Sequence, residues 1–204
     1  MRWLWALVGG GVLPNLSATC FGVPYSPRDR FSFAQIIDVR LRMSLTTLAL
    51  VFTLGVLAHN VEEALYLPAW SVRAGRWHVV VGSNEFRFAV VLLSVALVCI
   101  TAAASLANPG SPASYRLAGY VFAMVLNVVA PHGIATVAMR RYMPGTATAV
   151  LFNLPLGCLF LARALSEHFI QLEVFVWSAP LVAIAIVVSI PVLFAVGRKI
   201  QVEC

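Results

Sequence analysis

The sequence predicts an all-α membrane protein, a bundle of five transmembrane helices preceded by a weakly hydrophobic N-terminal extension. Of 204 residues, 61% are apolar and only 11% are charged, whereas soluble domains hold about 25% charged residues. The charges also leave six long charge-free runs, and the five beyond residue 42 are each close to the roughly 20 apolar residues that a spanning helix needs. Backbone amides in hydrocarbon must be paired within their segment, so runs without period-two alternation indicate helices and not a barrel.

Residues 1–42 are expected to form an N-terminal extension outside the five-helix membrane domain of residues 43–204. Their clean apolar stretch runs only from Trp3 to Leu13, which is too short to span a bilayer. Three interpretations stay open. The segment is an upstream extension that a protein starting at Met43 does not need, a weak extra helix, or a signal peptide whose charged n-region is Arg2.

The five predicted helices follow the charge-free runs in order. They cover residues 44–67, 88–107, 116–139, 146–165 and 174–196. The first opens directly after Met43, and the third carries Pro131 in its interior. The turn at residues 142–145, Tyr-Met-Pro-Gly, is expected to join the third and fourth helices as a close hairpin.

The basic residues predict the orientation. Beyond residue 42, one set of helix ends carries seven of them and the other carries only Arg116 and Arg163. The seven are Arg73, Arg76, Arg87, Arg140, Arg141, Arg198 and Lys199. The sequence thus predicts a multi-pass protein of the cell membrane. The positive-inside rule places the side richer in basic residues, which includes the C-terminus, in the cytoplasm. Counting the arginines of residues 28–42 on the poorer side would nearly cancel this bias.

The net charge of +6 is expected to meet the anionic headgroups of the lipid bilayer. No basic run with interleaved aromatic residues predicts a nucleic-acid partner. The oligomeric state is left open by the sequence.

The first predicted helix carries three ionisable residues within five positions: His59, Glu62 and Glu63. At about 100° per residue, the two glutamates lie about 60° and 40° to either side of His59, so all three point into one arc. An ionisable group at membrane depth raises a functional hypothesis by default. The alternative for the glutamates is contact with headgroup water, paired with Arg73 or Arg76, and for each histidine a packing role.

Other helices bring polar side chains to the same depth. Asn127 and His132 lie near the end of the third helix, and Asn153 lies about two turns into the fourth. Pro131 frees the carbonyl of Asn127 and is expected to kink the helix just before His132. These groups are therefore predicted to share one polar pocket near one leaflet.

Two histidines and one glutamate are a ligand set of zinc hydrolases. His59, Glu63 and His132 are accordingly the predicted ligands of one zinc or iron ion. Glu62 would act as general base or as a neighbour that supports the ligands, and Asn127 or Asn153 would orient the substrate. The substrate would be lipid-like or delivered through the membrane. A metal-free alternative exchanges protons between the glutamates and histidines, and a second alternative is a non-catalytic carrier of a cation or proton.

Two motifs also resemble a known family. The stretch His-Asn-Val-Glu-Glu at residues 59–63 is followed by Pro-Ala-Trp at 68–70, and Tyr-Met-Pro-Gly-Thr-Ala-Thr-Ala stands at 142–149. In this order they resemble the HXXEE-domain family of small bacterial integral membrane proteins, over roughly residues 44–197. The resemblance implies a helical membrane protein and no established reaction. The paired motifs of intramembrane proteases, His-Glu-x-x-His and Glu-Glu-x-x-x-Arg, do not occur in the sequence.

Overall fold

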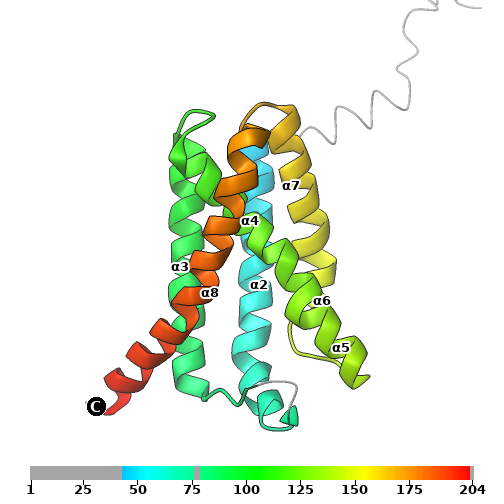
Figure 1. Ribbon diagram of the computed structural model, residues 1–204, viewed down its shortest axis with the longest axis vertical. Coiled ribbons are helices and arrows are strands. Elements are labelled where there is room, and N and C mark those ends of the chain that lie inside the picture. The colour runs from blue at the N-terminus through cyan, green and yellow to red at the C-terminus, as the bar shows by residue number, and fades with distance from the viewer. Residues whose placement is uncertain (1–42, 76–78, 203–204) are drawn as a thin grey trace, which may run out of the picture. The chain divides into compact units, whose positions relative to one another are not determined.

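The computed structural model describes residues 43–75 and 79–202, and its regular structure there is helical (Figure 1). Five segments of this part are long and apolar enough to cross a membrane. They cover Leu45–Ser71, Ser83–Leu106, Pro112–Met139, Thr146–Ser166 and Leu172–Ile200. The predicted class, an all-α protein with five helices of membrane-spanning length, is confirmed. The extension predicted at residues 1–42 lies outside the described residues.

The first two spans are continuous α-helices with bounds slightly wider than predicted. Helix α2 (Leu45–Ser71) begins after Ser44, whose hydroxyl accepts a backbone hydrogen bond of 3.0 Å from the first turn and satisfies a donor that the helix itself leaves free. Helix α3 (Ser83–Leu106) starts before the predicted residue 88. Glu85 lies in its first turn, where an acidic side chain interacts favourably with the helix dipole. Charge-free runs therefore locate the apolar core of a span and not its ends.

The third and fourth spans each contain a short π-helix. The third consists of α4 (Pro112–Asn127), the π-helix η3 (Val128–Gly133) and α5 (Ile134–Met139). The fourth consists of α6 (Thr146–Thr148), the π-helix η4 (Ala149–Asn153) and α7 (Leu154–Ser166). Pro131 lies inside η3, next to the non-helical Ala130, and Pro155 lies at the start of α7. Because proline has no backbone N–H, each interruption occurs where the regular hydrogen-bond ladder cannot continue.

The apolar core lies between α2, α4 and α7. Phe52 of α2, Val121 of α4 and Phe160 of α7 are fully buried there. The last helix, α8 (Leu172–Val202), packs against α3 and α4 and crosses them in Figure 1. Most of its large apolar side chains are exposed, as expected of a helix whose outer face meets lipid. Helix α2 therefore lies inside the bundle, and α8 lies at its edge.

Successive spans alternate in direction, so the end of α2, the start of α3, the end of α5 and the end of α8 share the lower end of the bundle in Figure 1. The basic residues that predict the cytoplasmic side lie at this end. Those described are Arg73, Arg87, Arg140, Arg141 and Arg198, together with Lys199. The site residues of α2 and η3 lie nearer to this end than to the other.

Candidate metal centre

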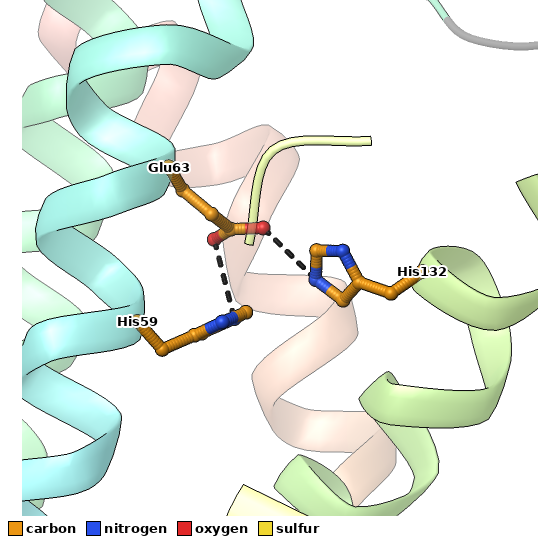
Figure 2. Close-up of side chains that lie close together, drawn as sticks. All are labelled: His59, Glu63 and His132. Atoms are coloured by element: carbon orange, nitrogen blue, oxygen red, sulfur yellow. Dashed lines mark ion pairs between the residues drawn. The ribbon is translucent and has the colours of Figure 1, made fainter. Parts of the chain in front are cut away.

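His59 and Glu63 lie one turn apart on α2, and His132 reaches them from η3 (Figure 2). The Glu63 carboxylate lies between the two imidazoles, with Oε1 3.1 Å from His132 Nε2 and Oε2 3.7 Å from His59 Nε2. The two rings meet edge to face with centroids 4.9 Å apart. Both histidine side chains are fully buried, and that of Glu63 is 16% exposed. The structure thus brings the three predicted metal ligands together.

The spacing of this group suits a metal ion. One ligand atom from each residue lies within 4.8 Å of the others. The ligand atoms of a tetrahedral zinc ion stand about 3.3 Å apart, given zinc–ligand bonds of about 2.0–2.1 Å. The two distances from Glu63 are already close to that value, and small side-chain rotations would bring the two imidazoles to it. The three residues could therefore hold a metal ion, and this ligand set suits zinc or iron.

His59 is held in the tautomer that a metal ligand needs. Its Nδ1 lies 3.0 Å from the carbonyl oxygen of Gly145 and 3.2 Å from Thr148 Oγ1. A carbonyl oxygen can only accept a hydrogen bond, so Nδ1 carries the proton. Neutral His59 then presents an unprotonated Nε2 toward Glu63. Metal-binding histidines commonly donate their second N–H to a backbone carbonyl in this way, which fixes the orientation of the ring.

His132 is fully buried with unsatisfied polar atoms. Neither of its ring nitrogens makes a hydrogen bond within the described part of the chain. Nε2 is 3.1 Å from Glu63 Oε1, but the two groups are not aligned as a hydrogen bond requires. A buried polar group without a partner destabilises a fold by about 1–3 kcal/mol. Coordination of an ion would supply a partner for one of the two nitrogens, which favours a metal site over simple packing.

The kink inside η3 turns Asn127 and His132 toward the same group. On a straight α-helix, residues five positions apart point about 140° away from each other. The chain is instead kinked between them at Ala130, whose φ of −131° and ψ of 117° are not helical, so the two side chains approach one face. Asn127 Nδ2 lies 3.3 Å from His59 Nε2. Asn127, which the sequence predicts as a substrate-orienting residue, therefore borders the ligand group at His59.

Glu62 faces a different part of the molecule from Glu63. Its Oε1 accepts hydrogen bonds from the Tyr142 hydroxyl and from Gly145 N, the latter at 2.9 Å, and its Oε2 accepts one from Thr148 at 2.7 Å. One oxygen is thus bound by the turn between α5 and α6, and the other by Thr148 of α6. That turn also supplies the Gly145 carbonyl to His59, so Glu62 supports a ligand through the backbone. Of the two roles left open by the sequence, this contact favours the supporting one.

Tyr142 and Thr148 are site residues that sequence reasoning missed. The Tyr142 hydroxyl, which donates to Glu62, accepts a hydrogen bond of 3.1 Å from Ala147 N. Partial burial raises the pKa of Tyr142, and the hydrogen bond to Glu62 raises it further, so the phenol stays protonated and keeps donating. The two threonines at 146 and 148 were a visible polar signal next to the turn. The carbonyl of Gly145 leaves no signal in a sequence, because every residue has one.

Glu62→Gln is expected to weaken zinc affinity by about 10- to 100-fold, the range found for residues that support metal ligands. The amide replaces one accepting oxygen by a donor, which would then face the N–H of Gly145 or the hydroxyl of Thr148. Zinc titration of the purified protein measures the change. Glu173→Gln, an exposed position in the first turn of α8, is the matched control. Equal affinities in the two variants would contradict the supporting role.

Asn153, the second asparagine predicted to orient a substrate, lies at the end of η4 and is fully buried. Neither its Nδ2 nor its Oδ1 has a hydrogen-bond partner among residues 43–75 and 79–202. The side chain therefore makes no hydrogen bond to His59, Glu63 or His132. Its predicted depth in the bundle is consistent with the structure, but contact with the ligand group is not found.

Asn153→Leu is expected to raise the melting temperature by about 2–4 °C, because removal of an unpaired buried amide relieves about 1 kcal/mol. Thermal unfolding in detergent measures the shift. Asn60→Leu is the matched comparison, since the Asn60 amide donates to Ser94 Oγ at 2.9 Å, and its loss should lower the melting temperature. A lower melting temperature for Asn153→Leu would show that its amide has a stabilising partner.

Comparison with known proteins places this arrangement in a family. Residues 50–160 match the model of a family described as "Protein of unknown function with HXXEE motif". The chain is also 36% identical over 151 residues to the uncharacterised protein YrkK of Bacillus subtilis (strain 168), which covers 74% of this chain and 95% of that protein. No solved structure gives a significant match. The chain therefore belongs to the HXXEE family, and its motif is the segment from His59 to Glu63 that contributes two of the three clustered side chains.

Proposed function

We propose that this protein is a metal-dependent hydrolase acting on a lipid-like or membrane-delivered substrate, with His59, Glu63 and His132 binding one zinc ion. The observation that carries the proposal is the half-buried Glu63 carboxylate between two fully buried imidazoles, one of which is already in its metal-binding tautomer. Charged groups at membrane depth are unfavourable by about 2.5–3.5 kcal/mol on insertion scales. Packing alone gives no reason to gather them, whereas an ion would compensate for their burial.

The residues around the ion have separable roles. Zinc with three protein ligands keeps a fourth position for water or substrate and lowers the pKa of water toward about 7. Asn127 is proposed to orient the substrate carbonyl, because its amide nitrogen is 3.3 Å from His59 Nε2. Glu63 presents its oxygens to different histidines, so one oxygen can bind the ion while the other accepts a proton. Glu62 is a positioning residue, since one of its oxygens binds the turn at Gly145 and the other binds Thr148 of α6.

The proposal places the bundle in the cell membrane with the C-terminus in the cytoplasm. Its support is the set of basic residues that share one end of the helices, including Arg73, Arg140 and Arg141, since basic residues mark the cytoplasmic side of membrane proteins.

The test is hydrolysis by protein reconstituted in lipid nanodiscs. Zinc-loaded protein is expected to release fatty acid from neutral acyl esters, 1,10-phenanthroline should abolish the release, and added zinc should restore it. His132→Ala should be inactive even with zinc added. Zinc binding without turnover of any ester or amide in a broad panel would overturn the hydrolase and favour the non-catalytic cation carrier.

A further inference from the structure

An apolar cavity of about 470 Å³ lies between α2, α3, α4 and α8 and reaches the candidate metal ligands His59 and Glu63. His59, Glu63 and Asn127 form part of its wall, together with Asn60. The remaining lining residues are apolar except Tyr120, whose hydroxyl donates to a backbone carbonyl of α3 at 3.1 Å. No lysine or arginine is among the described residues that line it. The cavity is therefore an apolar chamber with one chemically reactive wall.

The cavity is long, and helix α8 forms one side of it. Its lining on α8 extends from Ala183 to Phe194, which is about 16 Å of helix at 1.5 Å per residue. Helix α8 packs against α3 and α4, so it closes the cavity on the side facing α2. This shape suits an extended apolar chain better than a compact polar molecule.

The cavity opens toward the surface of the bundle. Four of its lining residues are also exposed. These are Ala130 and the larger Leu126, Val129 and Val187, which are 47%, 59% and 64% exposed. Leu126 and Val129 belong to α4 and η3, whereas Val187 belongs to α8. Exposed apolar side chains of a membrane span face hydrocarbon, because no water is present there. A molecule dissolved in the bilayer can therefore enter from the side.

We propose that the cavity holds the apolar chain of the substrate, and that the substrate is an uncharged lipid acyl ester whose carbonyl lies at the wall formed by His59, Glu63 and Asn127. This inference rests on the proposed function and specifies its substrate class. A chain gains little by leaving lipid for an equally apolar cavity, so recognition depends on the polar end. The lack of a basic side chain along the cavity excludes the usual binding of a phosphate group there.

The reaction is hydrolysis of the acyl ester. The oxygen of water forms a bond to the acyl carbon, and the bond from that carbon to the alcohol oxygen breaks. The alcohol oxygen leaves with the electron pair and takes one proton derived from the water. The carboxylic acid that remains releases the other proton, so no oxidant, reductant or further co-reactant is required.

The test of the chain-binding cavity uses a glycerol ether with a diazirine in its alkyl chain, which cannot be hydrolysed, added to nanodiscs that contain the full-length protein. After irradiation, mass spectrometry locates the labelled residues. Label is expected on the cavity residues Leu93, Ala123 and Ile190, and it should saturate at a low mole fraction of probe. Ala183→Phe, which fills the cavity, should reduce this label at least tenfold. Ala185→Phe, two residues away on an exposed face of α8, should not.

Zinc content and melting temperature are measured on each variant to detect misfolding. The smaller substitution Ala183→Leu should give an intermediate loss of label, as expected if the loss follows the volume that fills the cavity. Label that rises linearly with probe, as for any bilayer lipid, or that falls equally in Ala183→Phe and Ala185→Phe, would overturn the proposal. Saturable label in a protein that binds no zinc would support the cavity while the hydrolase fails. Zinc-dependent hydrolysis without label in the cavity would reject the cavity alone.

Discussion

Alanine at His59 or at His132 is expected to empty the metal site. The wild-type protein should hold close to one zinc or iron ion per chain, and each variant should bind the ion at least about 100-fold more weakly, since loss of a ligand exceeds the 10- to 100-fold effect of a supporting residue. Neither imidazole has a substitute nearby, because the described residues contain one group of three possible ligands, and these two are members of it. Plasma mass spectrometry of the purified protein measures the metal directly.

The matched control is His168→Asn. His168 lies after α7 with a φ of 55°, a left-handed conformation that asparagine tolerates, and it does not belong to the ligand group. This variant should keep its metal. Background metal in the wild type, with unchanged stability in both alanine variants, would contradict the metal centre and favour a metal-free carrier.

The five spans were predictable because the absence of charged residues from a segment can be read from the sequence alone. A bilayer excludes charge, so each charge-free run reports a span independently of the rest of the fold. The bounds were less predictable. Glu85 and Arg87 belong to α3 although they end the charge-free run, since helix ends project into the headgroup region where charges are tolerated.

The three clustered ligands were predictable from depth and helical geometry. His59 and Glu63 are four residues apart on one helix, which places them on one face whatever surrounds them. His132 could be assigned to the same level because its helix runs parallel to α2. Pro131 predicted a kink just before His132, and η3 contains this kink at the non-helical Ala130. The contacts of η3 with η4 and α6 could not be predicted from sequence.

The roles of the two glutamates could not be separated from sequence. Glu62 and Glu63 both lie within about 60° of His59 along α2, and only the neighbours decide their contacts. The turn at Gly145 and Thr148 binds Glu62, and the imidazole of His132 faces Glu63. The contacts of Asn153 could not be predicted from sequence either. It was predicted at the same depth in the membrane as the ligand group, but its amide makes no hydrogen bond to that group.

Gly145→Ala is expected to disrupt the candidate metal centre more than the addition of a methyl group at any other glycine. Gly145 has a φ of 93°, and a Cβ there would lie 2.7 Å from His132 Cε1, 2.9 Å from His59 Cε1 and 3.0 Å from Glu63 Cγ. These distances are well below van der Waals contact, and all three neighbours are members of the ligand group. The methyl group can be accommodated only if the imidazoles or the turn move.

Gly110→Ala separates this clash from the strain of the backbone. Gly110 has a φ of 75°, and nothing lies within 4 Å of an added Cβ. It should therefore lose only about 1–2 kcal/mol for the left-handed conformation, seen as a fall of a few degrees in the melting temperature. Gly145→Ala carries the same strain and adds about 1–3 kcal/mol of overpacking.

Zinc titration makes the comparison decisive. Gly110→Ala should bind zinc as the wild type does, whereas Gly145→Ala should bind it about 100-fold more weakly, because the displaced turn no longer presents its carbonyl to His59 Nδ1 and the ligands cannot close around an ion. Similar zinc affinities in the two variants would mean that the turn at Gly145 does not position the ligands. In that case, the hydrogen bond from His59 to Gly145 would only anchor the hairpin between α5 and α6.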